Sequence, residues 1–459
     1  MNKITKRFWL WSFWVLALFA IAQISIAQER GFRWARQGGG VGENVARGVS
    51  ADRWGNVVVT GSFKEKINFA RQELNSSGYQ DIFITKYDDN GEVIWVKHLG
   101  GRGRDFAFDI VQDEQGNSLV TGLFSEQVNF DEFSLRSFGS GDMFTAKINS
   151  SGTVIWVKQA GGRSLDGGNE IATDQTGNAL VIANTYGTVK VDDTFLRHQG
   201  SQDIFITKYN PNGTLLWAKQ IAGENSEQGR GISSDRANNV LVTGQFTGTI
   251  NLSGKQLTSR SQQKDIFLAK YDPNGNILWA KSFGGWGEDY GRGVAADERG
   301  NIYFTGVFSN QVEFDNYTLN SRAGSRDLFL AKADPNGKIL WVRQMGGFRA
   351  DEGSEIEVDA AGNAYISGEF SDRARFGSRQ LNSLGARDLF VAKFDPQGNL
   401  KWLERAGGNG DDVNYGISLA PEGKVTTVGT FTNSAEFGNF RLTSPGNTTD
   451  FFVFQLDKR

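Results

Sequence analysis

Acidic side chains recur at one fixed position along this chain, ten residues after a tryptophan. Carboxylates repeated in this way can coordinate a divalent cation or accept hydrogen bonds from the hydroxyl groups of a sugar. Like charges that lie close together raise each other's pKa, so such a set needs compensating partners. Arg47, Arg230 and Arg292, three residues further on in their repeats, can supply them. The recurring acids are Asp105, Asp166, Glu227, Asp289, Asp351 and Asp412, with Asn44 in the first copy.

The same recurrence also has a structural explanation. A residue that returns in nearly every copy of a repeat is normally needed by the scaffold, where it orders its own loop or pairs with a nearby arginine. Both alternatives stay open at this point. The sequence predicts no cofactor, with a divalent cation held by the acids as the alternative.

Aromatic residues that break the repeat are better candidates for a ligand site. Trp286, Tyr290 and Tyr415, together with Phe106 and Phe108, occur in the same variable segments as the acids. An exposed ring beside carboxylates can cover a sugar ring while the acids bond its hydroxyl groups, although the rings can equally fill space. The ligand-binding hypothesis therefore combines the six acids with Trp286, Tyr290 and Tyr415.

Seven copies of a unit of about 61 residues make up the chain after its N-terminal segment. One tryptophan returns every 61 or 62 residues, at Trp34, Trp95, Trp156, Trp217, Trp279, Trp341 and Trp402. The aspartate of a D-x-F motif returns in the same step, at Asp81, Asp142, Asp203, Asp265, Asp327, Asp388 and Asp450. A motif D-x-x-G-N marks a turn in five units; the fourth copy reads D-R-A-N-N, and the last copy is degenerate at Ala420. These landmarks leave no room for a second domain.

Each unit is predicted to hold four short β-strands. In one unit these are 291–297, 301–308, 327–334 and 338–345, which alternate or are rich in β-branched and aromatic residues. D-x-x-G-N and D-P-N-G supply the tight turns between them. The segment between the second and third strands is expected to form a short extra hairpin.

Four-stranded antiparallel units repeated seven times are typical of a β-propeller. The chain begins on a fourth strand, at 32–37, and ends on a third strand, so the N-terminal strand is expected to complete the last blade, which is 413–459 plus 32–37. The prediction is an all-β, seven-bladed propeller over 28–459, closed by strand pairing of its two ends. Its variable loops lie before the first strand of each blade, at one mouth of the central channel.

A family resemblance supports this fold. The unit "GRGVAADERGNIYFTGVF…DLFLAKADPNGKILWVRQMGG" resembles the bacterial β-propeller repeat family known as SBBP. The resemblance covers residues 32–459 and rests on D-x-x-G-N, D-x-F-x-x-K, D-P-x-G and the tryptophan in combination. It implies an exported bacterial propeller, and it implies no activity because the family supplies no catalytic residues to carry over.

The residues shared by all units are predicted to be structural. The seven tryptophans are expected to pack between blades, and the D-x-F aspartates to order the loop before the third strand through backbone N–H groups, with metal binding as the alternative. A lysine follows six of these aspartates by five residues, and it is expected to be solvated or to pair with acids on neighbouring blades.

Composition narrows the compartment and the partners. Residues 1–27 combine Lys3, Lys6 and Arg7 with an apolar run and small residues before Gln28, which indicates a signal peptide; an uncleaved anchor is the alternative. The formal net charge of −3 argues against a nucleic-acid partner. The chain has no cysteine, so neither disulfides nor thiolate chemistry are available. We expect a periplasmic or secreted monomer with no membrane span after cleavage.

The sequence favours a binding module over an enzyme. The two histidines, His98 and His198, stand in separate repeats, and no hydrolase or metalloprotease motif occurs. The preferred hypothesis is a non-catalytic exported module that binds a glycan or a protein through the loop-bearing face. A carboxylate-dependent carbohydrate-active enzyme, a hydrolase or lyase using the acids, and a purely structural envelope protein are the alternatives.

Overall fold

The computed structural model describes residues 31–70, 72–446 and 448–457, apart from the side chain of Ser354. Within those residues the chain is an all-β propeller, with strands β1–β42 and two 3₁₀ turns, η1 (Arg322–Gly324) and η2 (Pro421–Gly423). No helix among them is long and apolar enough to cross a membrane. The predicted signal peptide, residues 1–27, lies outside the described residues, so export remains a prediction.

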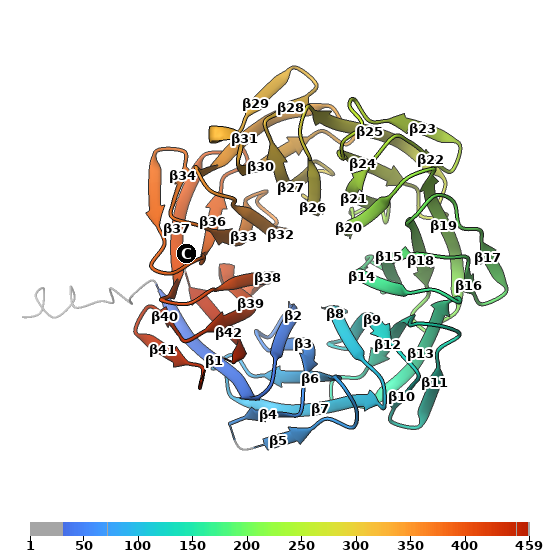
Figure 1. Ribbon diagram of the computed structural model, residues 1–459, viewed down its shortest axis with the longest axis vertical. Helices are drawn as coiled ribbons and strands as arrows, with labels where there is room; N and C mark the ends of the chain where they lie inside the picture. The colour runs from blue at the N-terminus through green and yellow to red at the C-terminus, as the bar shows by residue number, and fades with distance from the viewer. Residues whose placement is uncertain (1–30, 71, 447, 458–459) are drawn as a thin grey trace, which may run out of the picture.

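The strands form seven radial sheets of six strands each, here called blades, around a central channel (Figure 1). The inner strands are β2 (Asn44–Ala51), β8 (Asp105–Gln112), β14 (Asp166–Thr173), β20 (Glu227–Ser234), β26 (Tyr290–Ala296), β32 (Glu352–Val358) and β38 (Val413–Ala420). The second strands are β3 (Val57–Phe63), β9 (Ser118–Phe124), β15 (Ala179–Thr185), β21 (Val240–Phe246), β27 (Ile302–Ser309), β33 (Ala364–Phe370) and β39 (Lys424–Thr432).

Two further strands complete the four that the sequence predicts in each blade. The third strands are β6 (Asp81–Tyr87), β12 (Asp142–Ile148), β18 (Asp203–Tyr209), β24 (Asp265–Tyr271), β30 (Arg326–Ala333), β36 (Asp388–Phe394) and β42 (Thr449–Asp457). The fourth strands are β7 (Val93–Gly101), β13 (Val154–Gly161), β19 (Leu215–Gly223), β25 (Ile277–Gly285), β31 (Ile339–Gly347), β37 (Leu400–Gly408) and β1 (Phe32–Val41).

The prediction of four-stranded blades is wrong, because a hairpin from the next repeat extends every blade to six strands. The segment between second and third strands forms a hairpin as predicted, but it pairs with the fourth strand of the preceding repeat, as Val128 does opposite Gly101. This contact covers an otherwise open sheet edge. The hairpins are β4–β5 (Lys66–Phe69, Gln72–Asn75), β10–β11 (Gln127–Phe130, Phe133–Arg136), β16–β17 (Val189–Val191, Thr194–Leu196), β22–β23 (Thr249–Leu252, Lys255–Thr258), β28–β29 (Gln311–Phe314, Tyr317–Asn320), β34–β35 (Arg373–Phe376, Arg379–Asn382) and β40–β41 (Ser434–Phe437, Phe440–Thr443).

The ring is closed by the N-terminal strand. β1 pairs antiparallel with β42, from Trp34 opposite Gln455 to Gly38 opposite Phe451, and then with β4 of the first repeat. The last blade therefore has the order β38-β39-β42-β1-β4-β5. The closure follows the prediction, but the predicted last blade, 413–459 plus 32–37, lacks the hairpin β4–β5 and includes β40–β41, which pairs in the preceding blade.

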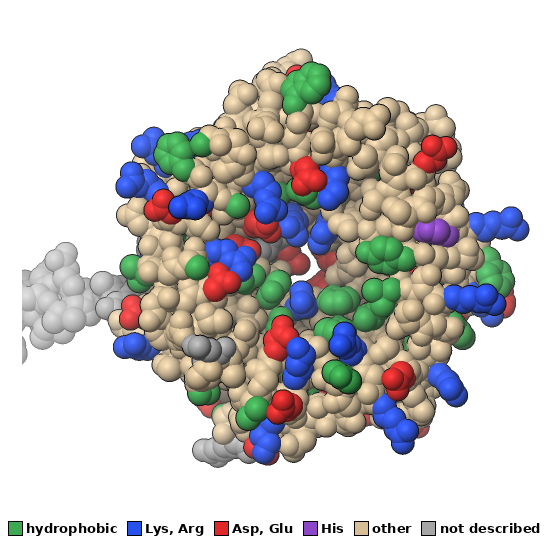
Figure 2. Space-filling view, viewed as in Figure 1, with side chains coloured by type: hydrophobic (Ala, Val, Ile, Leu, Met, Phe, Trp, Pro, Cys, Tyr) green, Lys and Arg blue, Asp and Glu red, His purple; other side chains and the backbone are tan. Residues whose placement is uncertain are grey.

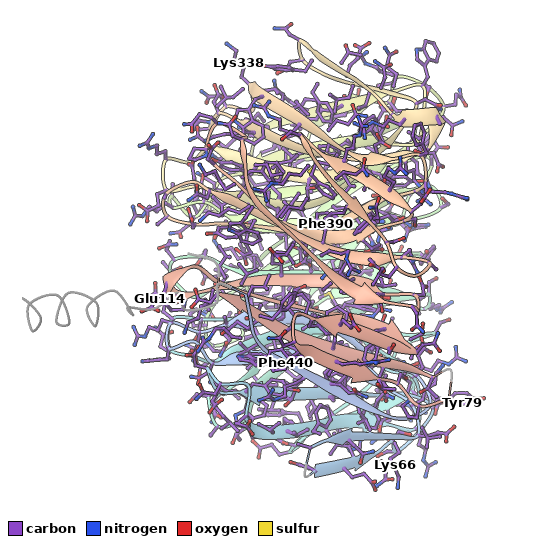
Figure 3. The ribbon with its side chains drawn as sticks, turned by 90° about the vertical axis from the view of Figure 1, so that its left-hand side faces the viewer. Lys66, Tyr79, Glu114, Lys338, Phe390 and Phe440 are labelled. Carbon is purple, nitrogen blue, oxygen red and sulfur yellow. The ribbon has the colours of Figure 1, made fainter. Side chains whose placement is uncertain are left out.

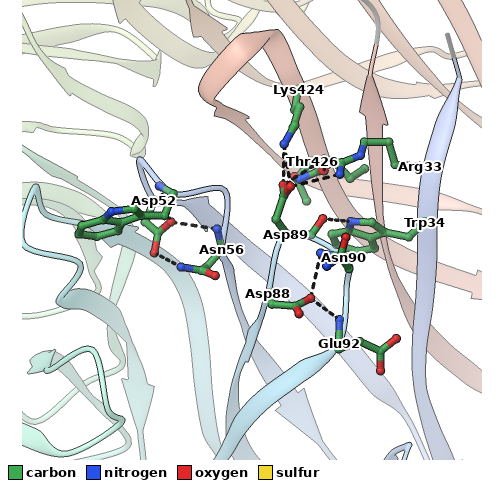
Figure 4. A network of polar contacts seen from close by, with 12 residues as sticks. Arg33, Trp34, Asp52, Asn56, Asp88, Asp89, Asn90, Glu92, Lys424 and Thr426 are labelled. Carbon is green, nitrogen blue, oxygen red and sulfur yellow. Dashed lines mark hydrogen bonds and ion pairs between the residues drawn. The ribbon is translucent and has the colours of Figure 1, made fainter. Parts of the chain in front are cut away.

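A polar network joins the two ends of the ring (Figure 4). Arg33 on β1 donates to both carboxylate oxygens of Asp89 at 3.0 and 3.1 Å, and Lys424 on β39 lies 2.8 Å from the same two oxygens. Trp34 Nε1 donates to the main-chain oxygen of Asp89 at 3.1 Å. Burial alone would raise the pKa of Asp89, but its hydrogen bonds with the two cations lower it. The last blade is thus tied to the first repeat by charge as well as by strand pairing.

The recurring tryptophans join neighbouring blades, as predicted. The indole of Trp341 donates to the main-chain oxygen of Pro396 at 3.1 Å, and a Cβ on Gly398 of the same turn would lie 3.0 Å from its ring. The equivalent indole bonds, all 3.0–3.1 Å, are made by Trp34, Trp95, Trp156, Trp217 and Trp279. Each ring therefore rests on the turn between third and fourth strands of the next blade.

Buried ion pairs hold the opposite turns in place. In six of the seven third strands a recurring lysine reaches the aspartate of the turn between first and second strands of its own blade, not of a neighbour. Lys208 lies 2.8 Å from Asp174, for example, with both side chains almost fully buried. The other pairs are Lys86–Asp52, Lys147–Asp113, Lys270–Asp235, Lys332–Asp297 and Lys393–Asp359.

The two faces of the ring carry different connections. In the strand registers, inner strands begin, second strands end, third strands begin and fourth strands end at the same face. Figure 3 shows Tyr79, before a third strand, and Glu114, in a D-x-x-G-N turn, on opposite sides of the ring. We call the side of Tyr79 the loop-bearing face. It carries the variable segments that the sequence placed at the channel mouth.

Candidate functional site at the channel mouth

The six recurring acids are structural and do not form an exposed ring. Each of them is 0% exposed, and none lines a cavity at the channel mouth. Each accepts a hydrogen bond of 2.7–3.1 Å from the N–H of the residue four positions earlier, a glycine in every case. Asp289, for example, binds Gly285 N with one oxygen and Ser309 N with the other, at 3.0 and 3.3 Å. These bonds order the loop that enters the inner strand, as the structural explanation predicts, and ligand binding by these residues stays an untested prediction.

Each recurring acid lies beside the D-x-F aspartate at the start of the third strand of the preceding blade. Burial raises the pKa of all six, and the neighbouring aspartate adds to the rise, as Asp265 does for Asp289. The pKa is raised to about 8 for Asp105, Glu227 and Asp289, to about 7 for Asp351 and Asp412, and to about 6 for Asp166. In the first blade Asn44 takes this position and donates from Nδ2 to Asp450 of the last blade at 3.4 Å. An amide thus stands where the other blades hold a carboxyl group whose neutral form is favoured.

The D-x-F aspartates order their loops through backbone N–H groups, as predicted, in six blades. Phe138 N donates to Asp142 at 2.9 Å, for instance, and equivalent bonds reach Asp81, Asp203, Asp265, Asp327 and Asp388. Both histidines lie beside such an aspartate: His98 Nε2 is 2.6 Å from Asp81, and His198 Nδ1 is 3.3 Å from Asp203. The described residues contain no group of three or more His, Cys, Asp or Glu arranged to hold a metal ion.

The third repeat departs from the others for a local reason. Thr185 stands where six blades end the second strand with a buried phenylalanine. Its hydroxyl donates to the carboxyl group of Asp166, which favours the ionised form and limits the rise of the Asp166 pKa caused by burial. The neighbouring Asn184 bonds the N–H of Gly229 at 2.8 Å and so links this blade to the next inner strand.

A β-bulge interrupts every inner strand three residues after the acid position. The register shifts there in all seven blades, for example between Ala46 and Gly48 and between Asn414 and Gly416. Bulges re-aim side chains and are frequent beside functional sites. The bulged residues are Arg47, Phe108, Asn169, Arg230, Arg292, Ser354 and Tyr415, and we call those with described side chains, all but Ser354, the rim set.

The rim set lines a cavity of about 390 Å³ at the mouth of the channel, here called the mouth cavity. Glu170, Glu352, Glu355, Glu369 and Asn414 complete its polar lining. Figure 2 shows the central hollow on this face, with basic side chains around it and acidic side chains inside it. The rim residue is arginine in three blades and phenylalanine, asparagine or tyrosine in three others, whereas the scaffold residues around it repeat.

The three rim arginines do not compensate the recurring acids, contrary to one of the expectations from the sequence. Arg292 pairs with Glu352 at 2.8 Å, and Arg230 donates to Gln228 at 2.9 Å. The guanidinium carbon of Arg47 lies 4.8 Å from the ring centroid of Tyr415 and 5.5 Å from that of Phe108. The arginines therefore point into the mouth cavity, away from the loops that the acids order.

Below the rim, acidic side chains line the channel. Asp109, Glu170 and Glu355 each follow a bulged residue, and with Glu357 they line a second cavity of about 300 Å³. Burial raises the pKa of Asp109 and of Glu357 to about 7, and raises that of Glu170 and Glu355 well above the usual range. Asp109 also accepts a 2.9 Å bond from Ile171 N of the next blade. Burial thus favours the uncharged form of these four carboxyl groups.

Two glutamates of one blade lie in unlike surroundings at the edge of the mouth cavity. Glu352 on β32 and Glu369 on β33 are register partners. Glu352 is held by Arg292 at 2.8 Å and Arg326 at 3.1 Å. Burial raises the pKa of Glu369 to about 8, assisted by the charge of Glu352. Such a pair can in principle divide the roles of proton donor and charged group.

The aromatic candidates separate into two groups. Tyr415 and Phe108 belong to the rim set, and Phe106 stacks on Phe108 with ring centroids 5.9 Å apart. Trp286 is 76% exposed on the loop-bearing face outside the mouth cavity. Tyr290 also lies outside the cavity lining, where its hydroxyl donates to Glu288. Of the three aromatic residues in the ligand hypothesis, the structure places Tyr415 in the cavity.

Sequence reasoning missed Asp109, Glu170, Glu355, Glu357 and Glu369 altogether. It also gave Arg47, Arg230 and Arg292 a supporting role that they do not play. For the arginines and for Asp109, Glu170 and Glu355 the signal is variation: the third and fourth residues after the repeated acid change chemical type between repeats that otherwise agree.

The comparisons with known proteins support the fold and leave the function open. No family model matches the chain. An uncharacterised WD repeat-containing protein of Acanthamoeba polyphaga mimivirus, L264, is 22% identical over 511 aligned residues, covering 88% of this chain and 36% of its own length. The regulatory protein FlaEY of Caulobacter vibrioides is 22% identical over 241 residues, covering 49% of this chain and 25% of its own. This chain thus spans 36% and 25% of the length of these two relatives.

The similar solved structures have a still lower sequence identity to this chain. A polysaccharide lyase, an ulvan lyase, has a TM-score of 0.47 at 10% identity, with 90% of this chain and 97% of that chain covered. Sqt1 from Chaetomium thermophilum has a TM-score of 0.42 at 9% identity, with 92% and 87% covered. At this level of similarity the solved structures carry no argument about activity. The chain is a β-propeller with a distant relative that contains WD repeats.

Proposed function

We propose that this chain is an exported bacterial β-propeller of the SBBP type that acts as a non-catalytic binding module and holds a glycan in the mouth cavity. The observation that carries the proposal is the rim set, which places residues of different chemistry at a β-bulge in each blade of a repeated scaffold. Rings such as Phe108 and Tyr415 can cover the apolar face of a sugar. Guanidinium and amide groups can bond its hydroxyl groups.

Exposed rings on the same face extend this argument from one sugar to a chain of sugars. Trp286 and Phe348 are 76% and 69% exposed in loops that precede inner strands. Phe138 and Phe195 flank a further cavity of about 540 Å³ on the loop-bearing face. Large exposed aromatic residues gathered on one face of a protein usually mark an interaction surface.

The test is binding of a glycan panel to the mature chain from residue 28, measured by thermal shift and confirmed by calorimetry. We expect at least one glycan to raise the melting temperature of the parent. Tyr415→Ala removes a ring from the mouth cavity and is expected to abolish that rise. Trp54→Ala, which removes an exposed ring from a D-x-x-G-N turn on the opposite face, is the matched control and is expected to retain it. A panel without any stabilising glycan would contradict the proposal.

A second candidate function is favoured by the pair Glu352 and Glu369. A carboxyl group that stays protonated near neutral pH, opposite an ion-paired carboxylate, is the arrangement that carboxylate-dependent carbohydrate-active enzymes use. The assay is release of new sugar ends from any glycan that binds. Loss of turnover in Glu369→Gln with binding retained would establish the enzyme and overturn the non-catalytic assignment.

Export and a monomeric state belong to the same proposal. The support is the residue pattern of 1–27 and the closure of the ring within one chain. N-terminal sequencing of the protein from a cell envelope or medium fraction is expected to begin at Gln28. The native mass is expected to be that of one chain.

A further inference from the structure

Three guanidinium groups at the mouth cavity each hold an unused hydrogen-bond donor. Among the described residues, the Nε atoms of Arg47, Arg230 and Arg292 are buried and have no hydrogen-bond partner. Buried polar groups are almost always paired, so three unpaired donors of one kind around a single cavity need an explanation. Arginine presents its N–H groups in a planar fork that matches the oxygens of a carboxylate or sulfate.

The balance of charge at the cavity is positive. Arg292 has an acidic partner in Glu352, but in the described part of the chain neither Arg47 nor Arg230 lies in an ion pair. Burial and the nearby charge of Arg292 lower the pKa of Arg230 to about 10, so its positive charge is poorly compensated. The carboxyl groups of Glu170, Glu355 and Glu369 favour their uncharged forms and do not offset it.

We infer that the mouth cavity recognises an oxyanion carried on a sugar residue, either the carboxylate of a uronate or a sulfate ester, through Arg47, Arg230 and Arg292. This inference rests on the proposed glycan-binding function and names the ligand class of that site. The anion satisfies the unused N–H donors, and the sugar ring lies against the aromatic part of the rim.

Two aromatic rings hold one of these guanidinium groups in place before any ligand binds. Arg47 lies between the rings of Phe108 and Tyr415, at 5.5 and 4.8 Å from their centroids. Stacking of this kind restricts a long side chain and leaves the edge of its fork free. A site ordered before binding loses less entropy when the ligand arrives.

The experiment is calorimetry on the mature chain with four probes. These are an oligogalacturonate, a sulfated galacto-oligosaccharide, a neutral galacto-oligosaccharide of the same length, and inorganic sulfate. The variants are Arg230→Gln and the charge-preserving Arg230→Lys. The matched control is Arg349→Gln, which alters an exposed arginine on the same face outside the mouth cavity. Melting temperatures of all variants are recorded first, so that a folding defect is recognised.

We expect one anionic oligosaccharide to bind at least tenfold more tightly than the neutral one, and to bind less tightly as salt is added. Arg230→Gln is expected to raise its Kd about tenfold or more, since hydrogen bonds to charged groups are strong, and Arg230→Lys to give an intermediate value. Arg349→Gln is expected to leave Kd unchanged. The preferred anionic probe identifies the uronate or the sulfate ester.

Three results would overturn the inference. If neutral and anionic oligosaccharides bound equally well and Arg230→Gln had no effect, the site would not recognise an anion, while the glycan-binding function would stand. Inorganic sulfate that binds as tightly as the sulfated sugar would show an ion site that does not recognise sugars. If no oligosaccharide bound, both the inference and the proposed function would be contradicted.

Discussion

Asn44 and Asp289 offer a reciprocal test of the carboxyl groups buried between the blades. Both residues occupy the same position in their repeats, and both are 0% exposed beside a D-x-F aspartate. Asp289→Asn replaces one of the six acids by the amide that the first blade already contains. Asn44→Asp does the opposite and places a seventh acid beside Asp450. The two substitutions should change the pH dependence of stability in opposite directions.

The expected size follows from the pKa of Asp289. Burial, helped by Asp265, raises this pKa from 3.8 to about 8, so the folded protein holds a proton that the unfolded chain has lost. For a raised acid pKa, the stability is complete below the unfolded value and falls as pH rises through the folded value. Each pH step across that interval costs about 1.4 kcal/mol per group, or on the order of 5 kcal/mol in total.

The measurement is urea unfolding, followed by tryptophan fluorescence, at several pH values between about 5 and 8. Asp289→Asn should match the parent at the acidic end and exceed it at the alkaline end, with a slope shallower by about 1.4 kcal/mol per pH unit. Asn44→Asp should match the parent at the acidic end and have a steeper slope by about the same amount. Parallel curves for all three proteins would refute the assignment of a shared, protonated carboxyl position.

Three further predictions concern the scaffold. Trp341→Ala removes the indole bond to Pro396 and should lower the free energy of unfolding by about 3 kcal/mol or more, measured in urea; a cost below about 1 kcal/mol would mean that the ring does not join the blades. Thr185→Val removes a donor to Asp166, so the pKa of that carboxyl group should rise above about 6 in a carbon-13 NMR titration, and a fall would contradict the bond. Asp89→Asn deprives its two cationic partners of their counter-charge and should cost about 1.5–3 kcal/mol, seen as a lower melting temperature; an unchanged melting temperature would show that the closing network does not stabilise the ring.

Much of the scaffold could be predicted because its residues repeat. The tryptophans and the D-x-F aspartates recur at one spacing, and the contacts of Trp341 and Asp142 are repeated by their equivalents in most blades. Strand alternation and turn motifs were enough to place four strands per unit. The six strands of each blade could not be predicted in this way. The hairpin pairs with a strand from another repeat, and local sequence does not specify that partner.

The site could not be predicted for the opposite reason. The regularity of the acids drew attention to Asp289 and its equivalents, yet regularity is what a scaffold requires. The bulge in each inner strand depends on pairing geometry and leaves no motif of its own. Arg230 and Tyr415 occupy this position in their repeats and differ in type, which is how a site is varied on a repeated framework.

The hairpin that each repeat lends to its neighbour has a mechanical consequence. A force that separates two sequence repeats must break a ladder of backbone hydrogen bonds, such as the one between β19 and β22, as well as pull apart packed side chains. The joint that holds the two chain ends carries the same ladder between β1 and β4. Around the whole ring, neighbouring repeats therefore overlap, because each contributes a hairpin to the sheet of the repeat before it. A single excised repeat would have an unpaired hairpin and an uncovered edge strand.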